Sequence, residues 1–539
     1  MNKNWLLVLF LILFVALLLL PGLSKSFLWD RDETFYAETA REMLITENYA
    51  IPSFNGTDFL EKPPFAYWMM VGSFRLFGVG EFAARFPSVL FGIGTVLLTF
   101  FLGRTLFDRK TGIFSSLILS TSLFFLVICK AAITDTYLLF FFTGSLLLFF
   151  LGREKRYCYS FAYALLGLAV LTKGPIGFLL PAAIVLLFLF FNKELKQLKM
   201  HLPLGFVIFL LIVSPWYLII AKSSGGKFFS EFILRQHLYR FIHPMQGHYG
   251  PFYYYLPILI FGLFPWSVFL PGALWSERRE LKRKNQKYLF LVIWIVVVFL
   301  FFSLSKTKLP HYILPLFPPS SILIAKFWAK EARTFLKPSL FILLGISILL
   351  ILMPISLFWI KPNFATKSLV INFAILVAGT LFAALSHLKV KRIFSSLVIT
   401  MLCFALFFSL KSVPEVNSFR IIAPLAKLVE KRAGPSDLVF SFRYFEPSMV
   451  FYSKHFVNWV DSLSELEEGA KRGEKIFCFI RKKDYEEIKD KIDFVLLAKK
   501  EGLSENKGEM TLFLMGVRSQ HLTNSATRLY TNFSRELRH

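Results

Sequence analysis

Two acidic residues of this chain stand beside apolar segments, in positions where a carboxylate could carry out chemistry. Asp32 lies in FLWDRDETFYAE after the first apolar segment, and Asp135 lies in CKAAITDTYLLF between two later ones. A carboxylate can act as a general base or bind a metal ion, and charges next to apolar segments are often functional. The simpler interpretations are an acid that begins a surface helix at Asp32 and an exposed turn residue at Asp135.

Basic residues lie in other segments between apolar stretches. Glu61 and Lys62 precede two prolines in NGTDFLEKPPFAYW, and the prolines keep this pair extended rather than helical. Ammonium groups in such segments suit a phosphate ligand. A solvated ion pair and lysines that snorkel to the membrane surface are the simpler interpretations. The lysines of these segments are Lys62, Lys173, Lys306 and Lys308.

Three histidines lie close together in RQHLYRFIHPMQGHYG, and these are His237, His243 and His248. Together with Glu61 they offer nitrogen and oxygen ligands of the kind that a divalent metal ion binds. Their spacing is not that of a compact metal-binding motif. The residues alone therefore make a metal site a hypothesis without a defined set of ligands.

The segments that position these residues are predicted to be membrane-spanning helices. Of 539 residues, 55% are hydrophobic and the mean hydropathy is +0.58. The apolar stretches are long enough to cross a bilayer as helices, which takes about 20 residues, and they lack the alternation of barrel strands. We read the first stretch as a retained span, not a signal peptide. The 13 predicted spans are 5–23, 84–106, 112–129, 136–152, 158–172, 175–191, 202–221, 252–274, 288–304, 312–328, 338–360, 368–387 and 393–411.

The basic residues predict which loops face the cytoplasm. With a cytoplasmic N-terminus, six compact loops on that side are all basic, as the positive-inside rule requires. The net charge of +26 is thereby explained without a nucleic-acid partner. The six loops are 107–110, 152–156, 192–199, 276–287, 329–337 and 387–392. The opposite face then carries the first external loop (24–83), the loop 222–251, the segment 305–311 and everything after about 412.

The chain is expected to have a transmembrane catalytic domain and a small soluble domain. Residues 1–412 form the first, including the loops 24–83 and 222–251. Residues 413–517 contain short strand-like runs such as DLVFSF and KIFCFI between helical segments, which predicts a small extracytoplasmic α/β domain. The polar residues 518–539 are predicted to be a disordered tail.

The combination of groups on one face predicts a substrate class. Cations suit a phosphate headgroup, carboxylates suit a general base or a metal ligand, and an apolar bundle suits a long lipid tail. An enzyme that uses a lipid-phosphate substrate fits all three features.

Seven segments resemble a known family when taken in order. These are DETFYAETAREM, NGTDFLEKPPFAYW, LFGVGEFAARFPS, AITD, LTKGPIGFLLP, HYGPFYYYLP and KLPHYILPLFPP. Over residues 1–412 the chain resembles the bacterial lipid A aminoarabinose transferases, which are related to the protein O-mannosyltransferases. The resemblance implies a GT-C glycosyltransferase fold with 13 transmembrane helices and an extracytoplasmic C-terminal domain.

The resemblance also implies roles for single residues. Asp32 matches the family's leading catalytic acid, Asp135 its second acid, and Lys62 a phosphate-contacting lysine. Tyr312 matches a tyrosine near the donor phosphate. Glu61 matches a metal-ligand position, with His248 or His243 as the histidine ligand of a divalent metal, for which zinc is the candidate. Family members often carry Arg-Tyr after Asp-Glu-Thr, whereas this chain has Phe35-Tyr36.

The activity implied is transfer of 4-amino-4-deoxy-L-arabinose from undecaprenyl phosphate to lipid A, with inversion. Such an enzyme would be a multi-pass protein of the bacterial inner membrane with a periplasmic active site, and we expect a monomer. One alternative is transfer of mannose or another sugar to protein or glycan. A second is a transporter of a lipid-linked sugar, which would place charges near the membrane midplane and often shows internal repeats.

Overall fold

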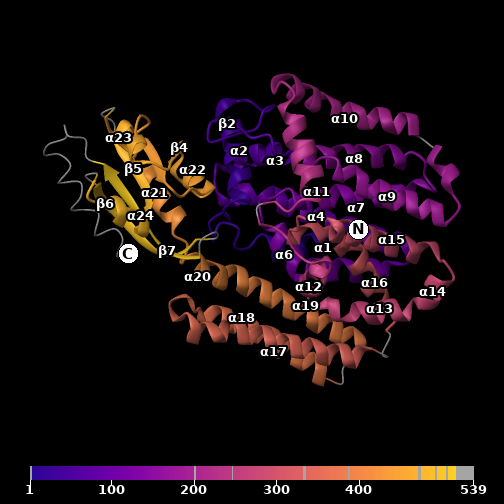
Figure 1. Cartoon of the computed structure of the whole chain (residues 1–539). Helices are drawn as coiled ribbons and strands as arrows, with labels where there is room; N and C mark the ends of the chain where they lie inside the picture. Colours follow the sequence, from indigo (N-terminus) through magenta and orange to yellow (C-terminus); the bar gives the residue numbers. More distant parts are fainter. Residues whose placement is uncertain are drawn as a thin grey trace. The chain divides into compact units, whose positions relative to one another are not determined.

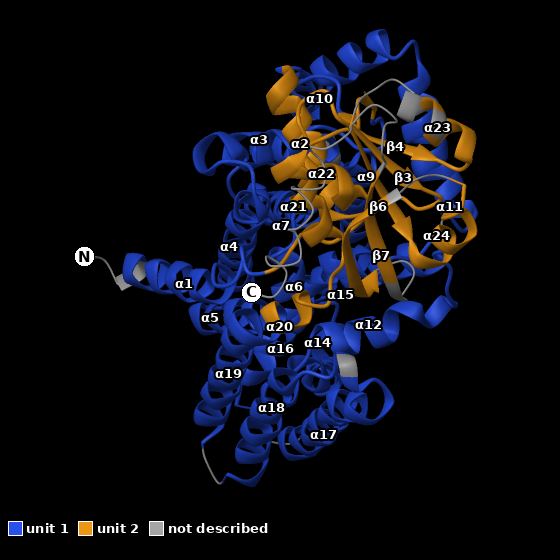
Figure 2. Cartoon of the chain, turned by 90° about the vertical axis from the view of Figure 1, so that its left-hand side faces the viewer, with its two compact units in different colours: residues 1–25, 47–52, 59–413 blue, residues 26–46, 53–58, 414–539 orange. Residues whose placement is uncertain are grey.

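The computed structural model divides the chain into two compact units (Figure 2). Unit 1 comprises residues 1–25, 47–52 and 59–413, and unit 2 comprises 26–46, 53–58 and 414–539. The first external loop is thus shared between the units. The structure describes residues 3–199, 202–245, 247–331, 335–386, 389–471, 475–491, 494–504 and 508–517, so the predicted tail 518–539 lies outside the described residues.

Unit 1 is helical throughout its described part (Figure 1). Its longer helices are α1 (Lys3–Leu19), α3 (Phe65–Phe77), α4 (Glu81–Leu106), α5 (Arg109–Ser120), α7 (Asp135–Gly152), α8 (Cys158–Lys173), α9 (Ile176–Phe191), α10 (Leu202–Ser223), α15 (Gln286–Leu304), α16 (Phe317–Ala329), α17 (Leu336–Ile360), α18 (Lys367–Leu385) and α19 (Val390–Phe407). Shorter pieces are α6 (Leu123–Cys129), η1 (Leu195–Lys199), η2 (Phe229–Tyr239), α11 (Arg240–Ile242), η3 (Phe252–Tyr254), α12 (Tyr255–Gly262), η4 (Trp266–Phe269), α13 (Leu270–Ser276), α14 (Arg278–Lys282), η5 (Pro310–Leu316), η6 (Pro362–Phe364) and η7 (Phe408–Ser412). The short helix α20 (Val413–Asn417) follows.

The helices confirm a multi-pass membrane protein. Among the described residues, eight helices are long and apolar enough to cross a membrane, and ten if each of two bent helix pairs counts as one span. Three shorter apolar helices also occur, and these are Trp5–Leu19, Cys158–Lys173 and Ile176–Phe191. Each of the 13 predicted spans falls on one of these helices or pairs, while the number of 13 crossings itself stays a prediction. Helices suit this setting because they satisfy every backbone polar group within one segment.

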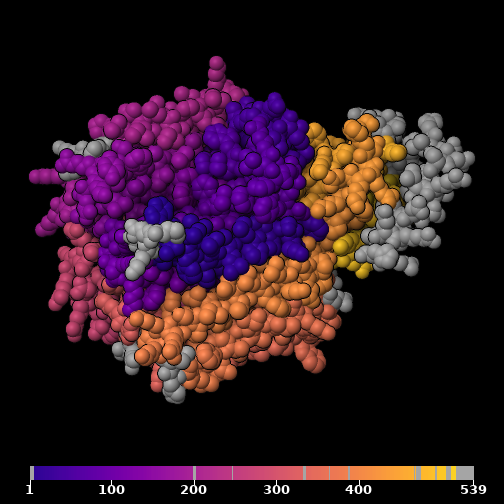
Figure 3. Space-filling view, turned by 180° about the vertical axis from the view of Figure 1, so that it is seen from behind, coloured from indigo at the N-terminus to yellow at the C-terminus, as the bar shows by residue number. Residues whose placement is uncertain are grey.

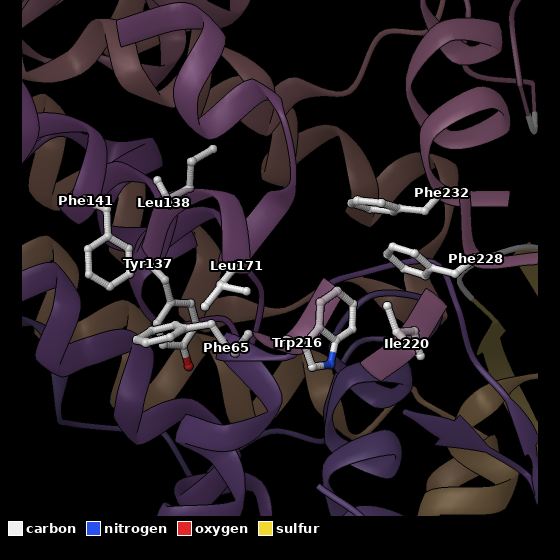
Figure 4. Packing of buried hydrophobic residues seen from close by; sticks show 11 residues of the cluster. Phe65, Tyr137, Leu138, Phe141, Leu171, Trp216, Ile220, Phe228 and Phe232 are labelled. Carbon is white, nitrogen blue, oxygen red and sulfur yellow. The ribbon is translucent and has the colours of Figure 1, made fainter. Parts of the chain in front are cut away.

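A buried aromatic cluster fixes the segments that surround the candidate site (Figure 4). Phe65 begins α3 and packs edge-on against Phe141 of α7, with ring centroids 5.0 Å apart. A second group forms around Trp216 of α10, whose indole nitrogen donates to the carbonyl of Ala50. Its ring is perpendicular to that of Phe228, 5.1 Å away. Edge-to-face pairs of this kind add stability beyond the area they bury, and here they hold both ends of the loop that carries Lys62.

The two sequence ends of unit 1 pack against each other. Helices α1 and α19 are in contact, and Figure 3 shows the indigo residues of α1 beside orange residues from the end of the unit. After α1 the chain turns at Gly22, which has a φ of +82°. A Cβ at this position would lie 2.5 Å from the carbonyl oxygen of Ser409. Only glycine combines this backbone conformation with so close an approach.

Unit 2 is an α/β domain with added elements from the first external loop. Its five-stranded sheet has the order β4-β3-β5-β7-β6, parallel between β3 and its two neighbours and antiparallel among β5, β7 and β6. The strands are β3 (Leu438–Phe442), β4 (Val457–Val460), β5 (Ile476–Arg481), β6 (Phe494–Ser504) and β7 (Gly508–Val517). The helices are α21 (Ile422–Arg432), α22 (Pro447–Ser453), α23 (Leu463–Lys471) and α24 (Lys482–Ile488). The first loop adds α2 (Glu33–Thr46) and the hairpin β1 (Ser53–Phe54) and β2 (Thr57–Asp58).

Candidate active site

A cavity of about 390 Å³ lies within unit 1. Most of its wall is apolar and comes from α7, α9, η2, α15 and η5. Polar side chains gather in it from segments that are far apart in the sequence. They are Lys62, Asp135, Lys173, Gln236, His237, Arg240, Ser305 and Tyr312. Five of these were identified from the sequence, namely Lys62, Asp135, Lys173 and Tyr312 as site residues and His237 among three histidines that could bind a metal ion.

Asp135 and Lys173 form the centre of this polar group. The ammonium of Lys173 donates to a carboxylate oxygen of Asp135 at 2.5 Å, and both side chains are largely buried. Asp135 begins α7 and Lys173 ends α8. These two helices are consecutive and packed together, so the start of one lies at the same level as the end of the other. The nearest nitrogen of His311 is 3.9 Å from the second carboxylate oxygen.

The position of Lys173 depends on the turn that follows it. Gly174 has a φ of +80° and ends α8, and Pro175 immediately precedes α9. A Cβ on Gly174 would lie 2.5 Å from the ring of Phe232, so this turn requires glycine. The lysine ammonium also lies 5.2 Å from the ring centroid of Tyr312, within cation–π range. Lys173 is thereby fixed between an acid and an aromatic ring.

Arg240 is a further cation of the cavity, and it was not among the residues predicted from the sequence. It follows η2, an 11-residue π-helix, and one of its terminal nitrogens donates to Gln236 at 3.0 Å. Its Nε atom is buried without a hydrogen-bond partner among the described residues. A guanidinium with an unused donor is well suited to bind an anion. The residue spacing in RQHLYRFIH does not indicate a π-helix. The direction in which Arg240 lies could therefore not be predicted from the sequence.

Lys62 is half-buried and lines the same cavity. Burial is the main cause that lowers its pKa, to about 8, and the neighbouring charges of Arg240 and Lys173 lower it further. Glu61 and Asp135 act in the opposite direction. Burial likewise lowers the pKa of His237, whose ring nitrogens lie 2.7 Å and 3.3 Å from the backbone carbonyls of Phe232 and Lys173. Both ring nitrogens of His237 therefore interact with the nearby backbone.

The other two predicted phosphate-binding lysines have different surroundings. The ammonium of Lys308 is buried and donates to the carbonyls of Phe302, Ser303 and Ser305, so it caps the C-terminal end of α15. Lys306 is exposed, and its backbone nitrogen donates to Phe241. Neither lysine lines the cavity. A contact of either one with a phosphate stays a prediction.

The predicted metal ligands are Glu61, His243 and His248. Glu61 is half-buried next to Lys62, and both histidines are exposed in the loop before α12. The ring of His243 packs against Tyr239 with centroids 4.4 Å apart. Within the described part of the chain, no three His, Cys, Asp or Glu side chains come together as a metal site would require. The residues present do not assemble a complete coordination sphere, so the chemistry derived below uses no metal ion.

Asp32 belongs to unit 2, where it is exposed directly before α2. The start of this helix is fixed by its neighbours, because Glu33 accepts a hydrogen bond from the backbone of Trp29 at 2.9 Å. Phe35, which stands where the family often has arginine, packs on Phe54 with ring centroids 4.6 Å apart. The aromatic replacement therefore has a packing role, and the predicted catalytic role of Asp32 stays a prediction.

Known structures define the class of fold. The crystal structure of ArnT from Cupriavidus metallidurans bound to undecaprenyl phosphate matches 95% of this chain and 98% of its own, with a TM-score of 0.80 and 21% identity. The archaeal oligosaccharyltransferase AglB from Archaeoglobus fulgidus, in complex with an inhibitory peptide and a dolichol-phosphate, matches 88% of this chain and 69% of its own, with a TM-score of 0.53 and 14% identity. The chain thus has the GT-C membrane fold with a C-terminal α/β domain, as predicted.

Sequence relatives make the relationship more specific. The family described as dolichyl-phosphate-mannose-protein mannosyltransferase matches residues 61–219. Undecaprenyl phosphate-alpha-4-amino-4-deoxy-L-arabinose arabinosyl transferases from Erwinia tasmaniensis and Edwardsiella ictaluri are each 36% identical, over 332 and 323 residues. These matches cover 60% and 59% of this chain, and 59% and 58% of the relatives' own length. The resemblance to the aminoarabinose transferases is therefore confirmed over this part of the chain.

Proposed function

We propose that the protein is an integral membrane glycosyltransferase that moves 4-amino-4-deoxy-L-arabinose from undecaprenyl phosphate to a phosphate of lipid A. The observation that carries this proposal is the cavity of unit 1. Its wall is apolar, as a polyprenyl chain requires, and three cations with one carboxylate lie together in it. The related enzymes are named for the same donor.

The charges of the cavity suit the departure of a phosphate. Lys62, Lys173 and Arg240 outnumber Asp135, which leaves two net positive charges when Lys62 is protonated. A sugar joined to polyprenyl phosphate is a phosphodiester with one negative charge. When the bond from the sugar carbon to the phosphate oxygen breaks, the leaving phosphate gains a second charge. Fixed cations stabilise this developing charge more than the ground state, and this lowers the barrier.

The acceptor determines how much base catalysis is required. For inversion, the acceptor oxygen attacks the anomeric carbon on the face opposite the departing phosphate oxygen. A lipid A phosphate is already anionic, so Asp32 orients it or receives the proton of its monoanion. A hydroxyl acceptor would give its proton to Asp32 and would depend on that residue more strongly.

The proposed location is the bacterial inner membrane, with a cytoplasmic N-terminus and a periplasmic active site, and the proposed state is a monomer. Ion pairs between loops support the placement of these loops on one common side of the membrane. Asp108 pairs with Lys326 at 2.9 Å and Glu277 with Lys330 at 2.6 Å. Arg153 pairs with Glu194 at 2.9 Å. These pairs connect loops or helix ends that the positive-inside rule assigns to the cytoplasmic side.

The experiment that tests the function is transfer of radiolabelled sugar from individual polyprenyl-phosphate donors to a membrane lipid extract by the purified protein. Label in lipid A from the aminoarabinose donor supports the proposal. Label in protein or another glycan would leave the fold and the donor class but replace the acceptor. If folded protein with added divalent metal transfers sugar from none of the donors, the proposal that the protein is an enzyme is overturned. The transporter would then be the alternative to pursue.

The pH dependence of transfer is expected to report on Lys62. Its pKa of about 8 means that the ammonium is charged below pH 8 and neutral above it. We therefore expect kcat/KM, which reports the free enzyme, to fall as the pH rises through about 8. Lys62→Arg should keep its charge and move this fall to higher pH. If kcat/KM of Lys62→Arg fell at the same pH as that of the unchanged protein, a role for this lysine would be contradicted.

We also propose that a divalent metal, with zinc as the candidate, is held by Glu61 and either His248 or His243. Support comes from the donor types, because carboxylate and imidazole are common zinc ligands. Metal content of the purified protein, measured by mass spectrometry, should fall in Glu61→Gln and in one of His248→Ala and His243→Ala. Treatment with a chelator should remove the same metal. Equal metal content in all variants would reject these ligands, whatever their activity.

A further inference from the structure

We propose that the C-terminal α/β domain holds Asp32 in position for catalysis, with Tyr452 and Asn55 as positioning residues. This inference rests on the proposed function, since it assigns a task to a residue of that reaction. All the contacts that carry it lie within unit 2. They surround Asp32 on both sides in the sequence, and they join residues about 400 positions apart.

Hydrogen bonds attach the segment before Asp32 to the C-terminal α/β domain. The backbone nitrogen of Leu28 donates to the hydroxyl of Tyr452 at 2.7 Å, a buried hydrogen bond. The carbonyl of the same residue accepts from Arg420 at 2.7 Å. Asp30 accepts from the backbone nitrogen of Ser448 at 2.9 Å. An extended segment with both backbone groups bound in this way has little freedom to move.

The segment after Asp32 is attached through the hairpin β1–β2. Asn55 and Gly56 form its two-residue turn, both with positive φ, as expected for an Asn-Gly turn. The amide of Asn55 donates to the carbonyl of Val457 at 3.0 Å and accepts from its nitrogen at 2.9 Å. Val457 begins β4, an edge strand of the sheet. The side chain of Asn55 therefore forms hydrogen bonds with the backbone of this edge strand, as the backbone of a neighbouring strand would.

Helix α2 connects this hairpin to Asp32. Glu42 of α2 is buried and accepts hydrogen bonds from the hydroxyl of Ser53 and the backbone nitrogens of Asn55 and Gly56. A carboxylate with three donors holds the turn firmly against the helix. Asp32 is exposed, although the chain on both sides of it is fixed to the domain. An exposed acid on a rigid backbone is suited to a positioned catalytic role.

The test compares Tyr452→Phe and Asn55→Gly with the unchanged protein, all as purified full-length chains. Phenylalanine removes only the hydroxyl, and glycine keeps the left-handed turn while it removes the amide. Tyr485→Phe is the matched control, because it removes a hydroxyl from the same domain, from a ring that packs on Phe513 of β7. We measure kcat, KM for the donor, thermal melting, and hydrogen–deuterium exchange of residues 26–46.

Both variants should raise exchange in residues 26–46 and lower kcat by about 10- to 100-fold. KM for the donor and the melting temperature should stay near those of Tyr485→Phe. Unchanged exchange would show that these contacts do not hold the segment, and faster exchange with full kcat would show that positioning is unnecessary. Either result overturns the inference. If the unchanged protein transfers no sugar at all, the proposed function fails, and exchange alone decides whether the domain holds the segment.

Discussion

Replacing Asp32 with asparagine is expected to lower the rate of sugar transfer by about 10²- to 10⁴-fold, the usual contribution of a positioned acid or base. Asparagine has nearly the same shape but cannot accept the acceptor's proton. The side chain is exposed, so the change should leave folding intact. The measurement is kcat of the purified variant with the aminoarabinose donor, together with its thermal melting temperature.

The matched control for this prediction is Asp58→Asn. Asp58 is also an exposed acid of unit 2 and lies in β2, so this variant removes the same charge while the hydrogen bonds described above for Ser53, Asn55 and Gly56 stay in place. It should retain the activity of the unchanged protein. Full activity in Asp32→Asn would remove Asp32 from the mechanism. A loss of equal size in both variants would point to the charge of unit 2 as a whole and not to one catalytic acid.

Replacing Lys173 with methionine is expected to lower kcat/KM by about 10²- to 10³-fold. The substitution leaves the buried Asp135 without its partner at 2.5 Å. The unpaired carboxylate then repels the donor phosphate. Removing one fixed group that stabilises a developing anion costs about 2.7–4 kcal/mol of transition-state stabilisation, which is about 10²- to 10³-fold in rate. Steady-state kinetics with the aminoarabinose donor measure the effect.

A second substitution separates the charge from the shape of this site. Lys173→Met combined with Asp135→Leu removes both charges and leaves the two net positive charges supplied by Lys62 and Arg240. Part of the lost activity should return in this double variant. Lys222→Met, at an exposed lysine near the end of α10, is the control and should behave as the unchanged protein. If the double variant is no better than the single one, transfer requires the ion pair or Asp135 as the predicted second acid, and not the net charge alone.

The sequence by itself determined the membrane fold and much of the cavity. Apolar stretches such as 288–304 indicate helices without reference to any other segment, because lipid allows few alternatives. Asp135 and Lys173 were identified because they are charged residues beside apolar stretches, and Lys62 because two prolines after Glu61-Lys62 keep this pair extended. The runs DLVFSF, HFVNWV, KIFCFI and DFVLLA predicted the strands β3, β4, β5 and β6, whereas β7 and α22 were not predicted.

Only the tertiary structure decided which of these residues act together. It pairs Asp135 with Lys173, adds Arg240 of α11, directly after the π-helix η2, and uses Lys308 to cap α15. It also divides the first external loop between two units and joins Asn55 to Val457, 402 positions away. Hydrophobicity belongs to a segment and can be read along the chain. Contacts between distant segments depend on how helices and strands pack, and a single sequence carries no local mark of that packing.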